Sequence, residues 1–172
     1  MQIRTYTGKM FNLANPDPEQ VDIRVIAHSL ARINRFNGHT DRGYSVGLHS
    51  LLVCDLAPSW LKLPALLHDA AETYTGDLMT PWKDLLQDFR EYERKIELAI
   101  CEHVGIDYNL IKSDEIKRLD LIAYMTECRD LMGYIPKGDK FNGLQCAEIT
   151  IYPVDEDLVE IMFLNRFYEL TR

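Results

Sequence analysis

The sequence contains no long hydrophobic run. None of its apolar stretches approaches the roughly 20 residues that a membrane-spanning helix needs. The first ten residues, MQIRTYTGKM, also lack the apolar core of a secretory signal peptide. We therefore expect no membrane-spanning helix, and a cytoplasmic chain without a membrane partner.

Cysteine is scarce, and the four cysteines lie far apart in the sequence. Cys54, Cys101, Cys128 and Cys146 form no CxxC pair, which excludes the usual spacing of a structural zinc site or a disulfide framework. Three of the four fall within helical patterns. We therefore expect reduced cysteines that serve in packing.

Positive charge is also in short supply. The chain has 19 lysines and arginines against 27 aspartates and glutamates, a formal net charge of −8. Affinity for duplex nucleic acid comes mainly from neutralising phosphates with Lys and Arg, so the net charge argues against a large nucleic-acid footprint, and we expect no duplex partner. A small anionic substrate would need a local positive site, built from a metal and a few basic side chains.

Helical periodicity accounts for most of the chain, and no alternation of strands and helices appears. The pattern predicts helices over residues 21–33, 46–57, 60–74, 91–104, 113–132 and 155–168. The residues IRTYTG and KMFNL flank a Gly-Lys turn and could form a short two-stranded ribbon. We expect an all-α fold with a possible N-terminal β-ribbon.

The length and composition fit one domain over residues 1–172. With 47% hydrophobic residues, a chain of this length can bury a sizeable core. Residues 1–16 form an N-terminal extension or ribbon in this interpretation, residues 21–132 form the core, and residues 155–168 form a C-terminal helix.

The most informative polar residues are His68 and Asp69, within LLHDAAE. A carboxylate and an imidazole buried side by side carry a large desolvation penalty unless a cation or a dense set of hydrogen bonds compensates both. A divalent metal would do so. The alternative is that Asp69 lies on a solvated helix face and His68 is an ordinary core histidine.

Two more ligand-type residues fall on inward helical faces. His49 is followed by Leu52, Val53 and Leu56, so it lies on an apolar stripe. Asp120 lies among apolar neighbours, and an inward aspartate needs a partner. Two imidazoles and two carboxylates from His49, His68, Asp69 and Asp120 suit one divalent ion, and the set does not choose between Mn, Co, Zn, Fe, Ni and Mg.

Glu72 follows His68 by one helical turn and therefore shares its face. A glutamate there could orient or deprotonate a water molecule at a metal site. The alternative is an ordinary exposed glutamate on a helix.

The order His49, His68-Asp69, Asp120 resembles the H…HD…D signature of the HD-domain metal-dependent phosphohydrolases. The segments YSVGLHS, LLHDAAETYTGDLMTPWK and KRLDLIA are similar to those of bacterial 5′-deoxynucleotidases and phage dATP triphosphohydrolases. The resemblance implies a helical HD-domain bundle that cleaves the C5′–O–P ester of a deoxynucleotide, with dATP or dAMP favoured. It implies release of a deoxynucleoside plus phosphate or triphosphate, and a homo-oligomer.

The same resemblance assigns two acidic residues to the chemistry. It implies that Glu72 acts on the attacking water and that Asp77 assists near the scissile oxygen. For Asp77, a turn aspartate that caps the next helix is the alternative interpretation.

Four further residues match substrate-binding positions of the family. Lys83 and Lys117 match lysines associated with a polyphosphate tail, although each could equally be a solvated surface residue. Arg35-Phe36 stands where the family carries Arg-Trp. This departure leaves the base preference open, and core packing is an alternative role for Phe36.

The same residues bear on three other functions. Alarmone hydrolases with an HD core show Glu-Asp where this chain has Glu72-Thr73, which counts against that activity. A binuclear phosphodiesterase would need more histidines than His103 between Asp69 and Asp120. A non-catalytic nucleotide-binding regulator would be expected to lose ligands or the water-activating acid, and every such position is filled here.

Overall fold

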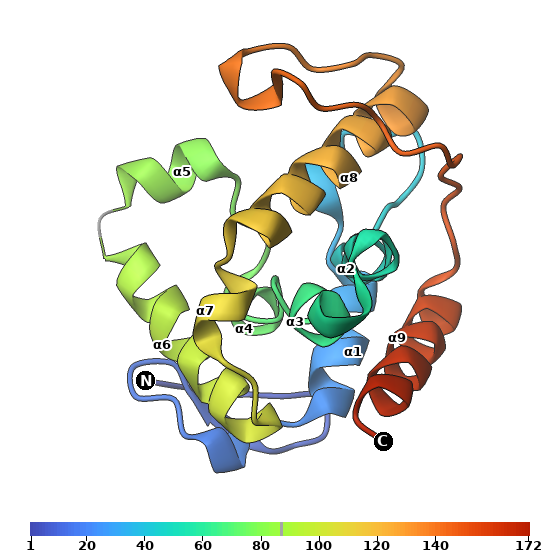
Figure 1. The fold of residues 1–172 in the computed structure, drawn as a ribbon. Coiled ribbons are helices and arrows are strands. Elements are labelled where there is room, and N and C mark those ends of the chain that lie inside the picture. The colour runs from blue at the N-terminus through green and yellow to red at the C-terminus, as the bar shows by residue number, and fades with distance from the viewer. Residues whose placement is uncertain (87) are drawn as a thin grey trace.

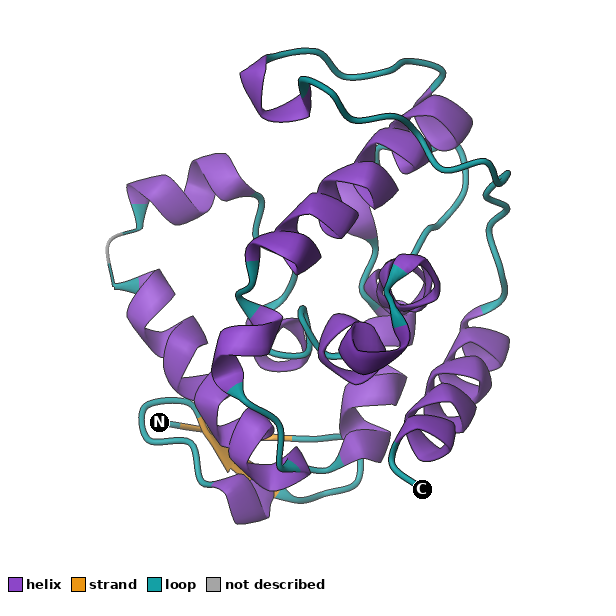
Figure 2. Cartoon of the chain, in the orientation of Figure 1, coloured by secondary structure: helices purple, strands orange, loops and turns teal. Residues whose placement is uncertain are grey.

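We describe a computed structural model of the chain, which covers residues 1–86 and 88–172. The described chain is mainly helical, with one small sheet at the N-terminus (Figures 1 and 2). This confirms the expected helical class and the N-terminal ribbon. The α-helices are α1 (Ile23–Arg32), α2 (Val46–Leu56), α3 (Lys62–Leu66), α4 (Glu72–Thr75), α5 (Thr80–Leu85), α6 (Phe89–Val104), α7 (Tyr108–Ile111), α8 (Asp114–Met132) and α9 (Glu156–Leu170). Short 3₁₀ turns cover Pro18–Gln20, Arg35–Gly38, Ser59–Leu61 and Asp139–Phe141.

The N-terminal ribbon pairs β1 (Gln2–Arg4) with β2 (Met10–Asn12) in antiparallel register, with Ile3 opposite Phe11. Phe11 is fully buried. Its ring stacks on Tyr74 of α4, with the centroids 3.6 Å apart. The ribbon is therefore anchored to the segment that follows the His-Asp pair.

Serine and aspartate side chains set the starts of the principal helices. Asp22 accepts a hydrogen bond from the backbone N–H of Arg24 and caps α1, so this helix begins two residues later than predicted. Ser45 caps α2, and Ser113 caps α8 as the sequence predicts. The Ser45 and Ser113 caps therefore fix where the two helices that carry His49 and Asp120 begin.

Helix α2 lies centrally, in contact with α1, α3, α8 and α9 (Figure 1). One side belongs to a cluster shared with α1 and α9, in which Leu30, Val46 and Phe163 are fully buried. The other side joins a second cluster shared with α3 and α8, which includes Val53 and Leu119. Because apolar packing surrounds α2, the position of any side chain on it is closely constrained.

Gly47 allows α2 to approach its neighbours closely. A Cβ atom at this position would lie 3.0 Å from Cγ1 of Val159, 3.1 Å from the backbone nitrogen of Ala31 and 3.2 Å from the carbonyl carbon of Leu30. Two of these atoms belong to the backbone of α1 and cannot rotate away. The absent side chain at Gly47 therefore permits the observed spacing of α1, α2 and α9.

Replacing Gly47 with alanine should destabilise the fold by about 1–3 kcal/mol, the usual cost of overpacking a core. Helix propensity alone predicts the opposite sign, because alanine normally stabilises a helix relative to glycine. The midpoint of urea unfolding for Gly47→Ala and the wild type distinguishes the two effects. A higher midpoint in the variant would contradict the close packing described here.

The prediction of one continuous helix over residues 60–74 is wrong. Helix α3 ends at Leu66 and α4 begins at Glu72, and His68 lies in the intervening turns. Bonds from the N–H of Ala70 to the carbonyl of Leu67, and from the N–H of Glu72 to that of Asp69, tighten this segment. Successive residues of an α-helix point about 100° apart, so the interruption lets both His68 and Asp69 face one centre.

The cysteines and the helix lengths agree with further expectations. All four cysteines are free thiols, of which Cys54, Cys101 and Cys128 are buried. Within residues 1–86 and 88–172, no helix combines the length and apolar character needed to cross a bilayer.

Candidate metal centre

The four predicted ligands meet around one ring nitrogen. Nε2 of His49 lies 3.3 Å from Nε2 of His68, 3.1 Å from Oδ1 of Asp120 and 3.5 Å from Oδ2 of Asp69. Nε2 of His68 lies 3.1 Å from the same Asp69 oxygen. Helix α2, the turn before α4, and helix α8 each contribute to this centre.

The centre is closed on one side and open on another. His49 is completely buried and His68 nearly so, whereas the Asp120 side chain keeps 42% of its surface exposed. A ligand can therefore approach past Asp120, while the packed face of α2 holds the histidines in place.

The ring orientations favour a cation between the two histidines. Nδ1 of His68 lies 2.8 Å from the carbonyl oxygen of Ala65, which can only accept, so this nitrogen carries a proton. Nδ1 of His49 lies 2.6 Å from a carboxylate oxygen of Glu127. Both Nε2 atoms are thus the ring positions available to a metal, which is the usual arrangement of ligand histidines.

The surrounding charges also favour a positive ion. Burial and the charge of Arg35 lower the pKa of His49, but Glu127 and Asp120 outweigh them and raise it to about 10. Burial raises the pKa of Asp69, yet the neighbouring positive groups hold it well below its usual range. The donor atoms of His49, His68 and Asp69 all lie within 4.8 Å of one another. This cluster could hold a metal ion, and its nitrogen and oxygen donors fit a divalent one.

Glu72 is buried, contrary to the alternative of an exposed helix glutamate. It begins α4 with 5% of its surface exposed, and Oε1 lies 3.8 Å from Nζ of Lys83. Among the described residues, Oε2 has no hydrogen-bond partner. Burial and the charges of Asp69 and Asp77 raise the pKa of Glu72 well above its usual value. A buried carboxyl oxygen without a partner is a position where a water or substrate atom would be accommodated.

Asp77 is half-buried in the turn between α4 and α5. The alternative role as a helix cap is not observed, because Met79 is the N-cap residue of α5 and no side chain caps that helix. Burial raises the pKa of Asp77, and the charge of Asp69 contributes in the same direction. Asp77 therefore belongs to the same electrostatic environment as Glu72.

Arg35 lies beside the centre. Its Nε and Nη2 atoms are each 3.2 Å from Oε2 of Glu127, and Nη1 is 3.7 Å from Oδ2 of Asp69. The adjacent Phe36 packs on Tyr124 of α8, with the ring centroids 5.8 Å apart. Phe36 has a positive φ of 55°, a conformation that non-glycine residues rarely adopt. Packing on α8 is thus an observed role for Phe36.

The two predicted lysines have different surroundings. Lys83 is mostly buried and lies between Glu72 and Glu93, 2.6 Å from Oε1 of the latter. Lys117 is 63% exposed and forms an ion pair with Asp114, three residues earlier on α8. The structure brings Lys83 to the site and leaves the Lys117 ammonium in a surface pair.

Glu127 is a component of the centre that was not predicted from the sequence. It is completely buried, and it contacts both His49 and Arg35. Burial raises its pKa, but these two partners outweigh that effect and lower it, so the group stays ionised. Glu127 follows Asp120 by seven residues, which places both on one face of α8. This seven-residue spacing is the sequence feature from which Glu127 could have been predicted.

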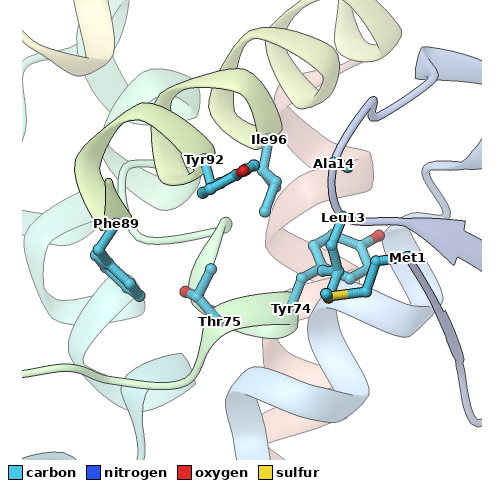
Figure 3. A pocket seen from close by; sticks show the side chains of 8 residues that line it. All are labelled: Met1, Leu13, Ala14, Tyr74, Thr75, Phe89, Tyr92 and Ile96. Atoms are coloured by element: carbon cyan, nitrogen blue, oxygen red, sulfur yellow. The ribbon is translucent and has the colours of Figure 1, made fainter. Parts of the chain in front are cut away.

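An apolar cavity of about 330 Å³ lies outside the predicted site. Figure 3 shows its wall, which is formed by the N-terminal segment, α4 and α6. None of the ten residues predicted for the site lines it. The lining residues are Met1, Leu13, Ala14, Tyr74, Thr75, Phe89, Tyr92 and Ile96.

Comparison with known proteins identifies relatives along most of the chain. The chain is 35% identical to the uncharacterized protein YfdR of Escherichia coli (strain K12) over 179 aligned positions, which cover 98% of this chain and 95% of that protein. It is 34% identical to the uncharacterized protein RCAP_rcc00048 of Rhodobacter capsulatus over 145 positions, 76% of this chain and 73% of that protein. No family model matches the sequence.

Proposed function

The chain belongs to the family of the Escherichia coli protein YfdR, and we propose that it is an HD-domain metal-dependent phosphohydrolase that cleaves the C5′–O–P ester of deoxynucleotides. The observation that carries the proposal is the convergence of four predicted ligands, from three separate segments, around Nε2 of His49. The buried Glu72 beside this cluster adds a group suited to proton transfer.

His49, His68, Asp69 and Asp120 would hold the metal ion. A bound divalent ion supplies Lewis-acid stabilisation of the negative charge that develops on the phosphoryl oxygens. Glu127 and Ala65 hold the Nδ1 atoms of the two histidines, so both Nε2 atoms would be free to bind this ion.

Glu72 and Asp77 would divide the proton transfers. Glu72 accepts a proton from the attacking water, for which its buried Oε2 has no hydrogen-bond partner among the described residues. As the water oxygen bonds to phosphorus, the bond from phosphorus to O5′ breaks. Asp77, half-buried in the turn between α4 and α5, donates a proton to the departing O5′.

Basic side chains would bind the phosphate oxygens. Nη1 of Arg35 is directed toward the centre beside Asp69, and a guanidinium suits a phosphate geometrically. Lys83 adds a positive charge next to Glu72. Because Lys117 has a surface partner instead, the case for a triphosphate substrate depends on Lys83.

A substrate panel tests the proposal. Each deoxynucleoside monophosphate and triphosphate is incubated with the protein and Mn²⁺, Co²⁺ or Mg²⁺, with chelator-treated samples as controls. We expect release of a deoxynucleoside together with phosphate or triphosphate, abolished by the chelator. Nucleotide binding without turnover under every metal would contradict the proposal and favour a non-catalytic regulator.

A further inference from the structure

Glu127 is a buried carboxylate that spans two parts of the site. Oε1 accepts a hydrogen bond from Nδ1 of His49 at 2.6 Å, and Oε2 accepts from Nε of Arg35 at 3.2 Å. No part of the Glu127 side chain is exposed. A carboxylate buried this completely needs strong partners, and these two occupy one oxygen each.

The contact with His49 determines which ring nitrogen faces the other ligands. With Nδ1 held by Glu127, Nε2 is directed toward His68 and Asp120. Carboxylate partners of this kind fix the tautomer and orientation of ligand histidines. The orientation of the His49 ring therefore depends on a residue outside the four predicted ligands.

The contact with Arg35 fixes a side chain that comes from a loop. Arg35 lies in the segment between α1 and α2, whereas Glu127 belongs to the long helix α8. Two guanidinium nitrogens are held by Glu127, which leaves Nη1 directed to the centre, 3.7 Å from Oδ2 of Asp69. The regular helix thus positions the loop arginine.

We propose that Glu127 is a positioning residue that holds the metal ligand His49 and the anion-binding Arg35 with the two oxygens of one carboxylate. Cation binding and phosphate binding then share a single support. The part that concerns phosphate rests on the proposed function, whereas the part that concerns the metal rests on the ligand geometry alone.

The variant Glu127→Gln tests the proposal with nearly unchanged volume. A glutamine has one acceptor oxygen and an NH₂ group, so it can accept from only one of its two partners and presents donors to the other. By isothermal titration calorimetry, we expect Mn²⁺ to bind roughly 10- to 100-fold more weakly than to the wild type. In protein saturated with Mn²⁺, inorganic phosphate should also bind several-fold more weakly.

Glu97→Gln is the matched control. Glu97 is also a buried glutamate, but it lies in α6 and contacts Lys112 and Tyr108. We expect this variant to lose stability while its Mn²⁺ and phosphate affinities stay at the wild-type values. Wild-type affinities for both ligands in folded Glu127→Gln would overturn the proposal, as would equal losses in the two variants.

A second variant covers the case in which Glu127→Gln does not fold. Glu127→Asp keeps the charge but is shorter by one methylene group, so its carboxylate cannot reach both partners from the same backbone position. Weaker binding of Mn²⁺ or phosphate is expected, and wild-type binding of both would overturn the proposal. Neither titration depends on turnover, so an inactive wild type whose Mn²⁺ affinity falls in the Glu127 variants would refute the proposed function and leave the positioning role intact.

Discussion

Glu72→Gln should lower the kcat for the best deoxynucleotide by roughly 10²- to 10⁴-fold, the usual contribution of a general base. Glutamine preserves the size of the buried side chain but cannot take a proton from water at neutral pH. The Mn²⁺ affinity should change little, because Glu72 is not one of the four ligands. Steady-state kinetics and calorimetry with Mn²⁺ measure the two effects separately.

Glu93→Gln provides the control for this variant. Glu93 lies 2.6 Å from Nζ of Lys83, the ammonium that also lies 3.8 Å from Glu72. Its replacement disturbs the same lysine without removing the proposed base, so only a small change in kcat is expected. Full activity in Glu72→Gln would contradict the role assigned to Glu72.

His68→Ala and Asp69→Ala should lose both metal binding and activity. Each removes a donor atom from the centre, so the fall in Mn²⁺ affinity should exceed the roughly 100-fold that loss of an outer partner can cost. When the free Mn²⁺ concentration is 100 times its Kd, the free energy of unfolding of the wild-type protein should rise by about 2.7 kcal/mol. Thermal unfolding with and without Mn²⁺ should therefore show a metal-dependent rise in Tm for the wild type and none for either variant.

Asp114→Ala is the corresponding control on α8. Asp114 lies in the same helix as Asp120 but is fully exposed, and it pairs with Lys117 at the surface. The metal-dependent rise in Tm should persist in this variant. A normal rise in His68→Ala or Asp69→Ala would show that the ion binds elsewhere.

Local sequence was sufficient to predict most long helices. The prediction for α8 began at the correct cap, Ser113, and α6 and α9 were found within two residues of their predicted bounds. Their starts depend on side chains close in sequence, and their apolar spacing depends only on the helical period. The predicted continuous helix over residues 60–74 is interrupted after Leu66, where the carbonyl of Ala65 accepts from the His68 ring. Apolar periodicity contains no information about such a contact.

Site residues could likewise be predicted where local sequence determines their position, and could not where contacts between distant segments determine it. His49 and Asp120 could be identified because each lies on an inward helical face, and the structure brings them together. Glu127 was missed because a helix glutamate is ordinarily solvated, and its burial depends on partners from distant segments. For Lys117, spacing gave the helical face but could not give the position of a long side chain's ammonium group.

The close fit of Gly47 against Val159 has a consequence for synthesis of the protein. A chain emerges from the ribosome N-terminal end first, so all four predicted metal ligands are made before α9. Until Val159 and Phe163 of that helix have been synthesised, α2 lacks part of its apolar cover. The nascent chain therefore contains all four predicted ligands before it contains the helix that completes the packing around α2.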